Sequence, residues 1–534
     1  MQKTVLFGKT AREKLLLGIE LLAEAVRTTL GPKGRNAIID RGFGYPMITN
    51  DGVTIAKEIE VKDETENLGA KVIKEVAEKT NELAGDGTTT AVVLAYAIIK
   101  KGLTNIAAGA NPLAIKRGID KGVEVVVNYL KTSSKKISTK AEMAQVATIS
   151  AENEEIGAMI AETVEEVGKD GVITVEDSKT LTTEKEVVKG LQFNKGYISA
   201  YMVTNLEKME GVLEDPCIVI TDKRVSSIQD SLKVMETVAN SGKSSLLLIA
   251  EDVEGEALAT FVVNRLKGIF NTIAVKAPGF GAGKKDLLED IATVVGCKVV
   301  SEEAGYKLDT ITKDQLGSSR KVIVSKDRTV IVGGKGDKAV LDSRIASIKT
   351  IIAKTENKYD KDFLRERLAK LTGGVAVIRV GAQTEVEQIA KQHKTEDALN
   401  ATLAAVEEGI VPGGGVALAK ASALLVNITD DPEEKVGVEI LKEALQSPLK
   451  QIAENAGVNG DVVVENIAFN NKNAKEGYGF DAKKMKYCDL LEAGIIDPVK
   501  VTRSALQNAA SAAAMFLTTE TTIALHVDKK PEQE

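Results

Sequence analysis

Gly85-Asp86-Gly87-Thr88-Thr89-Thr90 is a polar hexad that stands directly before the apolar run AVVLAYAII of residues 91–99. The run predicts a buried helix, so the hexad lies where that helix begins. A helix N-terminus offers unpaired N–H groups and partial positive charge to a phosphate, and glycine lets the backbone approach a ligand closely. Asp86 is an oxygen ligand of the kind that Mg²⁺ prefers. The hexad therefore indicates a nucleotide phosphate site, with an ordinary helix start capped by Asp and Thr as the alternative.

The composition is that of a soluble globular protein with several domains. The chain has 534 residues, of which 43% are hydrophobic and 28% are charged. This length predicts roughly two to four domains. The net charge of −7 gives no general attraction to nucleic acid or to anionic membranes. The aromatic content of 4%, with no tryptophan, argues against a surface that stacks on bases.

Cysteine and histidine are too sparse for two common kinds of site. Cys217, Cys297 and Cys488 form no CxxC pair, so we expect reduced thiols in a cytoplasmic protein. His393 and His526 are far apart in sequence, which argues against a catalytic triad or a multi-histidine zinc site. The N-terminus lacks the apolar segment of a signal peptide, and no uninterrupted apolar run approaches the roughly 18 residues of a membrane span. We therefore expect no membrane partner.

Periodicity along the chain predicts helical ends around an α/β middle. Amphipathic helices are expected at 10–30, 65–84, 88–108 and 112–131, and residues 384–520 are again rich in helical patterns. Between them, predicted strands at 217–221, 246–250, 272–276 and 298–300 alternate with predicted helices at 228–240, 255–267 and 284–296. This alternation indicates a largely parallel sheet. We expect the α/β part to be inserted into a helical domain built from both chain ends, with Gly190 and Gly373-Gly374 where the chain crosses between them.

Further glycine-rich turns and acids are dispersed along the chain. They occur at Thr29-Leu30-Gly31-Pro32, at Asp51-Gly52, at Asp397 and at Gly413-Gly414-Gly415. Hydrolysis of a phosphoanhydride without histidine needs a metal to neutralise charge and a carboxylate to orient water. Three separate aspartates, Asp51, Asp86 and Asp397, provide enough carboxylates for that work. Each Asp-Gly pair is also typical of a plain turn, and the spacing does not show that these aspartates meet in space.

Several of these motifs together resemble the group I chaperonins, the GroEL family. The motifs are TLGPKGRN at 29–36, DGVT at 51–54, the hexad at 85–90, EDVEGEAL at 251–258, KAPGFG at 276–281, GGGV at 413–416 and DPVKVTRS at 497–504. The resemblance implies an ATP-driven folding machine of two stacked heptameric rings that works with a GroES-type co-chaperonin. It implies a multidomain α and α/β fold with a helical equatorial ATPase domain from both chain ends (1–133 and 409–534). An intermediate α+β hinge domain (134–189 and 374–408) and an inserted α/β apical domain (190–373) would complete it.

The resemblance also implies roles for individual residues. Asp86 would hold Mg²⁺, and Asp397, supported by Asp51, would activate water. Hinges would lie at Gly190, Gly374 and Gly409, and a K⁺ site near Thr29. The residues implied to bind nucleotide are Thr29, Leu30, Gly31, Pro32, Asp86, Gly87, Thr88, Thr89, Thr90, Gly414, Gly479, Phe480, Asp481, Ala482 and Asp497.

A second set of residues matches the family's surface for non-native proteins and for the co-chaperonin. Its members are Tyr197, Tyr201, Met202, Leu232, Met235, Leu258, Val262 and Val263. Leu232 and Met235 are spaced to share one helix face, and methionine suits binding to varied partners. Taken without the resemblance, the same residues are typical of the core of an α/β domain.

The sequence departs from the family pattern at several positions. Met202 and Met235 stand where the best-known members have Phe and Leu, and Asp481 replaces an Asn. The tail lacks the usual Gly-Gly-Met repeats. Two other functions remain open at this point: a metabolic ATPase or kinase whose α/β domain binds a small substrate, and a passive binding scaffold.

Overall fold

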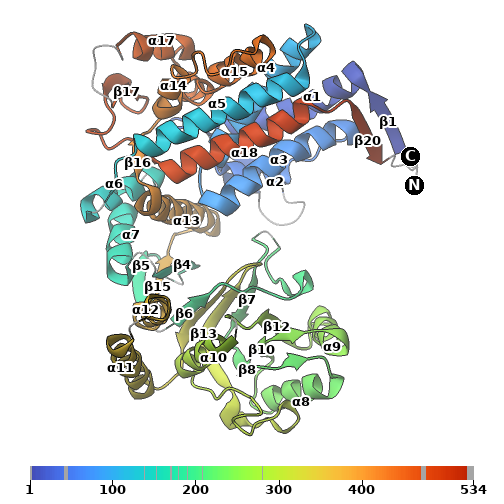
Figure 1. Cartoon of the computed structure of the whole chain (residues 1–534), viewed down its shortest axis with the longest axis vertical. Coiled ribbons are helices and arrows are strands. Elements are labelled where there is room, and N and C mark those ends of the chain that lie inside the picture. Colours follow the sequence, from blue (N-terminus) through green and yellow to red (C-terminus); the bar gives the residue numbers. More distant parts are fainter. Residues whose placement is uncertain are drawn as a thin grey trace. The chain divides into compact units, whose positions relative to one another are not determined.

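The computed structural model describes residues 3–40, 46–137, 139–151, 153–168, 171–178, 180–188, 190–206, 208–279, 281–355, 357–470 and 477–525. His526 and the C-terminal tail lie outside these residues. The chain forms two compact units (Figure 1). Unit 1 comprises Met1–Glu162, Lys179–Thr182 and Val380–Glu534, and unit 2 comprises Thr163–Ser178 and Thr183–Arg379. The α/β segment is thus inserted between two parts of a helical unit, as the sequence predicts.

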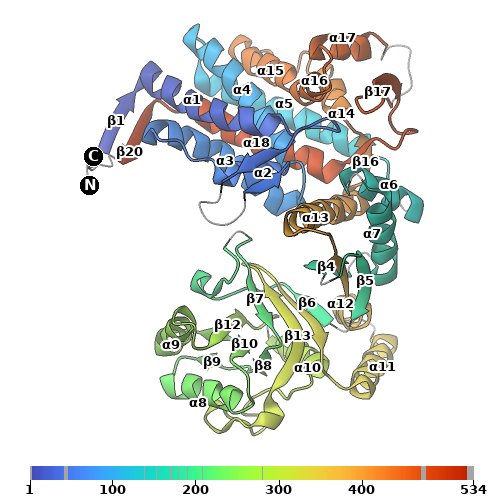
Figure 2. The ribbon, with the colours of Figure 1, turned by 180° about the vertical axis from the view of Figure 1, so that it is seen from behind.

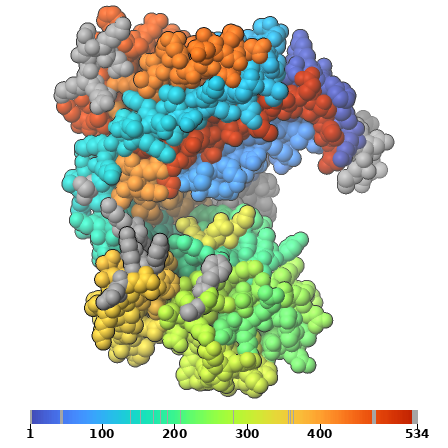
Figure 3. Space-filling view, viewed as in Figure 1, coloured from blue at the N-terminus to red at the C-terminus, as the bar shows by residue number. Residues whose placement is uncertain are grey.

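Unit 1 is a helical bundle built from both ends of the chain. Its long helices are α1 (Gly8–Arg27), α3 (Glu64–Ala84), α4 (Thr88–Ala107), α5 (Pro112–Thr132), α13 (Glu385–Glu408) and α18 (Val499–Leu517). Its shorter helices are α2 (Gly52–Glu58), α6 (Lys140–Ala151), α14 (Val416–Ser422), α15 (Pro432–Ala444), α16 (Ser447–Asn455) and α17 (Gly460–Asn470). The helix α7 (Glu154–Val167) runs from unit 1 into unit 2. In the space-filling view, α5, α18 and α3 form adjacent bands on one face of unit 1 (Figure 3).

Helices α1 and α3 pack unusually closely because glycine lies at their crossing. A Cβ on Gly18 would lie 1.7 Å from the carbonyl oxygen of Glu66, and one on Gly69 would lie 2.0 Å from that of Leu15. Asp63 caps α3 by accepting hydrogen bonds from two backbone N–H groups of its first turn. The predicted start of this helix is therefore correct to within one residue.

Helix α4 lies at the centre of the unit 1 core, against α1, α3, α15 and α18. Ala91, Val92, Leu94, Ile98 and Ile99 are fully buried in it. The described residues contain one helix that is long and apolar enough to cross a membrane, and it is α4, half of which is buried inside the structure. A mostly buried core helix passes the same test of length and composition. We interpret α4 as such a core helix.

Short strands complete unit 1. Strand β1 (Lys3–Phe7) pairs with β20 (Thr521–Leu525), which joins the two ends of the chain. Strands β2 (Ala37–Ile39) and β3 (Met47–Thr49) form a second pair, β16 (Ile410–Pro412) and β19 (Ile496–Pro498) a third, and β17 (Tyr478–Asp481) and β18 (Lys486–Asp489) a fourth. All of these pairs are antiparallel.

Unit 2 contains a seven-stranded sheet (Figure 2). Its strands are β6 (Gly190–Phe193), β7 (Gly211–Glu214), β8 (Cys217–Ile220), β10 (Ser245–Ala250), β12 (Asn271–Lys276), β13 (Gly317–Val324) and β14 (Thr329–Gly334). Strands β8, β10 and β12 are parallel, as predicted, but β13 pairs antiparallel with β7, β8 and β14. The sheet is therefore mixed and not largely parallel, because a short turn joins β13 directly to β14 instead of a crossover helix.

Helices and smaller strands surround this sheet. The helices are α8 (Ile228–Ala239), α9 (Gly255–Leu266), α10 (Gly281–Val295), α11 (Lys338–Lys354) and α12 (Lys358–Gly373), with short 3₁₀ turns η1 (Ala200–Met202), η2 (Leu308–Thr310) and η3 (Lys313–Gln315). Strand β9 (Arg224–Val225) pairs with β11 (Asp252–Val253). Strand β15 (Val375–Val380) lies between β4 (Val172–Asp177) and β5 (Glu184–Val188) in a three-stranded sheet.

Candidate functional site

The turn between α3 and α4 carries the hexad, and it ends one helix while it begins the next. Gly85 closes α3 with a φ of 68°, and Gly87 is the N-cap of α4 with a φ of 80°. These left-handed conformations favour glycine over residues with a Cβ. Between the two glycines, Oδ1 of Asp86 accepts a hydrogen bond from the N–H of Gly87 at 2.5 Å. Helix α4 then begins at Thr88, so the free N–H groups of its first turn belong to the hexad.

Asp51 is brought to the hexad through the glycine that follows it. It caps α2, and its Oδ2 accepts hydrogen bonds from the N–H and the Oγ1 of Thr54 at 3.0 and 2.5 Å. A Cβ on Gly52 would lie 2.4 Å from Oγ1 of Thr89 and 2.9 Å from Oγ1 of Thr88. The start of α2 therefore packs against the start of α4. Two helix N-termini, each with partial positive charge, meet at this place.

Asp397 reaches the same place from α13. A Cβ on Gly85 would lie 2.4 Å from the side chain of Asn400, which is one helical turn beyond Asp397. Ala84, Ala404 and Val501 form a small apolar cluster that holds α13 against α3 and α18. The charges of Asp51 and Asp86 both act on Asp397. The three aspartates that the sequence left scattered are thus brought together in unit 1.

Asp497 joins the group through the pairing of β16 with β19, in which it lies opposite Val411. A Cβ on Gly413 would lie 2.9 Å from Oδ1 of Asp497. Gly414 has a φ of 63° and faces open space, since nothing lies within 4 Å of the position of a Cβ on it. The glycine-rich loop therefore leaves room beside Asp497 for a ligand.

The electrostatics of these carboxylates are unbalanced. Burial raises the pKa of Asp86 to about 6, and the charge of Asp51 adds to the rise. Burial raises the pKa of Asp497 to about 7, with a further contribution from Asp86. Burial also raises the pKa of Asp397 well above its usual range, with the charges of Asp51 and Asp86 next in size. Within the described residues, no Lys, Arg or His forms an ion pair with any of these four aspartates. The site therefore favours a cation from outside the protein.

The donors present fit Mg²⁺ bound mainly through a ligand. Across the described part of the chain, no three His, Cys, Asp or Glu side chains are grouped closely enough to hold a metal by themselves. Mg²⁺ is commonly held by one or two carboxylates together with substrate phosphates and water. One Oδ of Asp86 is engaged by Gly87, and the other receives only a long contact of 3.5 Å from Oγ of Ser150. Asp86 thus retains a carboxylate oxygen for a cation beside the α4 N-terminus.

The other predicted nucleotide residues line a neighbouring cluster. Leu30 packs against an apolar group that contains Val416, Leu449, Phe480 and Ala482. This contact brings the loop after α1, the start of α14 and the β17 hairpin together. Phe480, Asp481 and Ala482 are buried. Oδ1 of Asp481 accepts hydrogen bonds from the backbone N–H groups of Lys483 and Lys484.

The same loop has its own internal hydrogen bonds. Thr29 is buried, and its Oγ1 donates to the carbonyl of Val26 at 2.8 Å. Gly31 has a φ of 84°, and a Cβ on it would lie 3.1 Å from Ile452. The side chain of Asn455 donates to the carbonyl of Leu30 at 2.9 Å. This loop and the β17 hairpin therefore offer backbone and glycine surface to a ligand more than free side chains.

The predicted hinge glycines have three different surroundings. Gly190 is a strand residue of β6, and a Cβ on it would lie 2.2 Å from the carbonyl oxygen of Ile331. Close packing therefore requires glycine there. Gly374 and Gly409 have φ values of 64° and 89°, which favour glycine. Hinge motion at these positions stays a prediction.

The predicted client surface divides into exposed and buried members. Tyr201, Leu232 and Val263 are 69%, 51% and 45% exposed, and Tyr197, Leu258 and Val262 are partly buried. Helices α8 and α9, which carry most of these residues, are in contact. An apolar surface across α8, α9 and Tyr201 thus exists in unit 2.

Met202 and Met235 do not belong to this surface, so the prediction is wrong for them. Met202 is fully buried, and its sulfur accepts a hydrogen bond from the N–H of Ala274 at 3.2 Å. Met235 is 8% exposed because it lies on the core side of α8, whereas Leu232 faces outward. Two exposed residues were missed, Leu266 and Ile269 at the end of α9. The sequence signal that could have identified Leu266 and Ile269 is the run of apolar residues that continues past the last turn of α9.

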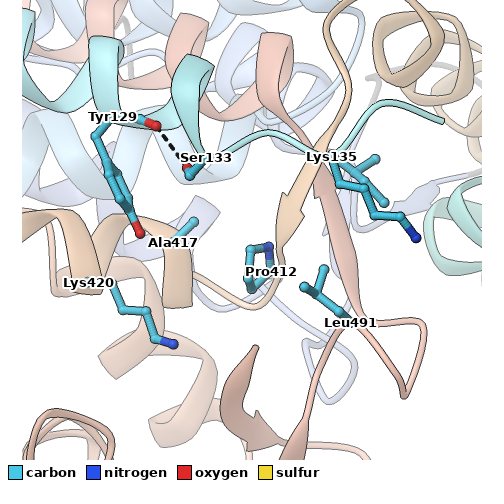
Figure 4. Close-up of a pocket in the computed structure, with 8 residues that line it drawn as sticks. Tyr129, Ser133, Lys135, Pro412, Ala417, Lys420 and Leu491 are labelled. Carbon is cyan, nitrogen blue, oxygen red and sulfur yellow. Dashed lines mark hydrogen bonds between the residues drawn. The ribbon is translucent and has the colours of Figure 1, made fainter. Parts of the chain in front are cut away.

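A small cavity lies behind the glycine-rich loop (Figure 4). Tyr129, Lys135, Pro412, Lys420 and Leu491 are among its lining residues. Its volume of about 20 Å³ suits a water molecule and not a nucleotide.

Comparison with known structures places this fold among the chaperonins. The crystal structure of the chaperonin gp146 from the bacteriophage EL 2 (Pseudomonas aeruginosa), obtained in the presence of ATP-BeFx, matches with a TM-score of 0.67 at 21% sequence identity. The match covers 99% of this chain and 100% of the phage chain.

The model of the TCP-1/cpn60 chaperonin family matches residues 22–526. This chain therefore belongs to that family, which confirms the resemblance to the GroEL-type chaperonins and the multidomain α and α/β fold. It is a chaperonin, and thus a molecular chaperone.

Proposed function

We propose that this chaperonin folds non-native proteins by a cycle driven by Mg²⁺-dependent ATP hydrolysis. The observation that carries the proposal is the group of four aspartates that, among the described residues, have no ion-pair partner and lie beside the N-termini of α2 and α4. A nucleotide phosphate suits the helix N-termini, and Mg²⁺ suits the carboxylates. The similar phage chaperonin was crystallised in the presence of an ATP analogue, which supports this assignment.

Each part of the site has a proposed role. Mg²⁺ held by Asp86 would neutralise phosphate charge. The N–H and hydroxyl groups of Thr88, Thr89 and Thr90, with Gly87, would bind the phosphates. Asp397, supported by Asp51, would orient the attacking water and accept its proton, for which a raised pKa is suited.

The remaining residues would enclose the rest of the nucleotide. Open space at Gly414 beside Asp497 would admit the adenosine. The neighbouring backbone that would line it belongs to Leu30, Gly31, Pro32, Gly479, Phe480, Asp481 and Ala482, with K⁺ near Thr29.

The apolar surface of unit 2 is the proposed site for clients and for a GroES-type co-chaperonin. Tyr201, Leu232 and Val263 would contact an exposed apolar segment, with Tyr197, Leu258 and Val262 at the base of the surface. The co-chaperonin would then enclose the client in the cavity of a ring. We place this activity in the bacterial cytoplasm.

We propose assembly into heptameric rings, two of them stacked. Two antiparallel pairs in unit 1 support it, because each is only two strands wide and bears exposed apolar side chains. Ile38 is 73% exposed in the β2–β3 pair, and Phe7 and Ile523 are 66% and 59% exposed in the β1–β20 pair. Unpaired strand edges of this kind are suited to pairing with another copy of the chain.

The test of the proposal is ATP turnover with and without Mg²⁺ in the variant Asp397→Ala. We expect ATP binding and assembly to be retained and turnover to fall by roughly 100-fold or more, since a base that activates water is lost. Glu396→Ala is the matched control on the same helix and should keep normal turnover. Normal turnover in Asp397→Ala would contradict the assignment.

A second test concerns folding itself. A denatured enzyme should regain activity with this protein only when Mg²⁺, ATP and a GroES-type partner are all present. Electron micrographs of the same sample should show seven-fold rings. Small-molecule stimulation of ATP turnover in a modest oligomer would instead indicate a metabolic enzyme.

A further inference from the structure

We infer that Arg265 is a positioning residue that fixes the exposed Tyr201 beside α9, and thereby sets the shape of the client surface. This inference rests on the proposed function of that surface. Nη1 of Arg265 donates to the carbonyl of Tyr201 at 2.7 Å, and Nη2 donates to the carbonyl of Val203. One guanidinium therefore binds two carbonyls of the same segment, on either side of Met202.

The segment is anchored on its other side by the sheet. The N–H of Ile198 donates to the carbonyl of Ala274 at 2.9 Å, and the sulfur of Met202 accepts from the N–H of Ala274 at 3.2 Å. Met202 is fully buried, whereas Tyr201 next to it is 69% exposed. The sheet thus determines the depth of the segment, and Arg265 determines its distance from α9.

Arg265 has no other evident role in the structure. Within the described residues it forms no ion pair, and its Nε is buried without a hydrogen-bond partner. Burial lowers the pKa of its guanidinium, and no carboxylate compensates. A cation that is kept partly buried without a counter-charge is costly, so its bonds to the two carbonyls are the interaction that accounts for its position.

The geometry explains why arginine and not lysine suits this position. The planar fork of a guanidinium reaches two carbonyls at once, whereas an ammonium would satisfy one of them. Without the fork, Tyr201 would move independently of Val262 and Val263 on α9. Ordering it again on binding would weaken the affinity for a client.

The first test is hydrogen exchange in the full-length protein. The amides of Met202 and Val203 donate to the carbonyls of Ser199 and Ala200 at 3.0 and 3.1 Å. In Arg265→Met we expect these two amides to exchange about tenfold faster, with no change in β8 or β10. Lys267→Met is the control, since it removes an exposed cation of the same helix end. Unchanged exchange at the two amides in Arg265→Met would overturn the inference.

The second test measures binding to two permanently non-native chains, reduced and carboxymethylated α-lactalbumin, which is acidic, and the same derivative of a basic protein. Arg265→Met should bind both about three- to tenfold more weakly, and Arg265→Lys should restore only part of the affinity. Tyr201→Ser in combination with Arg265→Met should show a non-additive loss, because one residue acts through the other. Basal ATP turnover of the single variant Arg265→Met should stay normal.

Three outcomes would contradict the inference. A loss confined to the acidic client would mean that Arg265 contacts carboxylates directly. Full affinity in Arg265→Lys would mean that charge alone suffices, and additive losses would mean that Tyr201 is not involved. If the unmodified protein bound neither client, the proposed function of the surface would fail, while the exchange experiment would still test the contact of Arg265.

Discussion

Buried or partly buried aspartates occur in both units of this chaperonin, but their surroundings are opposite. In unit 2, Asp290 is 5% exposed. Its carboxylate accepts hydrogen bonds from Nε of Arg367 at 2.7 Å and from Nε of Arg344 at 2.8 Å. Oδ2 of Asp286 accepts a hydrogen bond from Nη1 of the same Arg367 at 2.8 Å. This network joins α10 to α11 and α12, and its charges are balanced. We call it the paired network.

In unit 1, Asp51, Asp86, Asp397 and Asp497 have no such partners among the described residues. We call them the unpaired group. Burying a charge without compensation is costly, whereas a buried charge with good partners can join elements of a fold. From this difference we infer that unbalanced charge indicates a site for a ligand, whereas balanced charge indicates a structural role. One substitution, Asp to Asn, tests this in both units.

The largest effect is expected from Asp86→Asn. The amide keeps the size of the side chain but removes the charge that would hold Mg²⁺, so ATP turnover should fall by roughly 100-fold or more. The free energy of unfolding without nucleotide should not fall, because the lost charge has no partner to leave behind. Steady-state turnover and urea denaturation measure the two quantities. A marked loss of stability would show that the charge of Asp86 has a stabilising partner, and it would contradict the contrast between the two units.

The second prediction concerns Asp290→Asn in the paired network. It leaves Arg367, which is 4% exposed, and Arg344 without their main counter-charge. Removing one partner of a buried pair should lower the free energy of unfolding of unit 2 by about 3 kcal/mol. ATP turnover per folded molecule should remain normal. Denaturant unfolding followed in unit 2 measures the loss, and a change below about 1 kcal/mol would contradict the role of the network.

The sequence predicts the elements of these two regions far better than their contacts. Helix α4 and the hexad at its start follow from local pattern, since glycine and a long apolar run act over a few residues. The proximity of Asp86 and Asp397 does not follow from local pattern. It depends on the packing of Asn400 against Gly85, two residues that are far apart in the sequence. Family resemblance supplied that pairing in advance.

The paired network had no sequence signal of its own, whereas the burial of Met202 and Met235 agrees with what their residue type predicts without the family resemblance. Arg367 and Asp290 are ordinary members of charged helices until α10 and α12 are placed together. The family resemblance assigns Met202 to the surface. In the structure its side chain lies in the core, where the sulfur accepts a hydrogen bond from the backbone N–H of Ala274 in β12. The contacts of Arg367 and of Met202 both depend on tertiary packing, which the periodicity of the sequence does not reveal.

The third prediction uses pH to separate the two regions. Burial raises the pKa of Asp497 from 3.8 to about 7. Between these two values the native state holds a proton that the unfolded state has lost, so the free energy of unfolding falls as pH rises through this window. Asp497→Asn removes the dependence.

We therefore expect Asp497→Asn without nucleotide to be more stable than the unsubstituted protein at pH 8, by about 1–2 kcal/mol after screening by water, and nearly equal to it at pH 4. Thermal unfolding at a series of pH values measures the difference. A variant that is less stable at pH 8 would show that Asp497 has a stabilising partner, and it would then belong with the paired network.

The smallest effect is expected where pairing occurs without burial. Lys370 donates to Glu366 at 2.7 Å on α12, one turn from Arg367, but the two side chains are 33% and 61% exposed. Lys370→Ala should change the free energy of unfolding by less than about 0.5 kcal/mol, because water solvates both charges in the folded and unfolded states. The helix itself is little disturbed, since alanine is a good helix former. Urea denaturation beside Asp290→Asn gives the contrast within one pair of neighbouring helices. If the two substitutions cost the same, the number of ion pairs and not their burial would stabilise unit 2. The balance of charge in unit 1 would then carry no special meaning either.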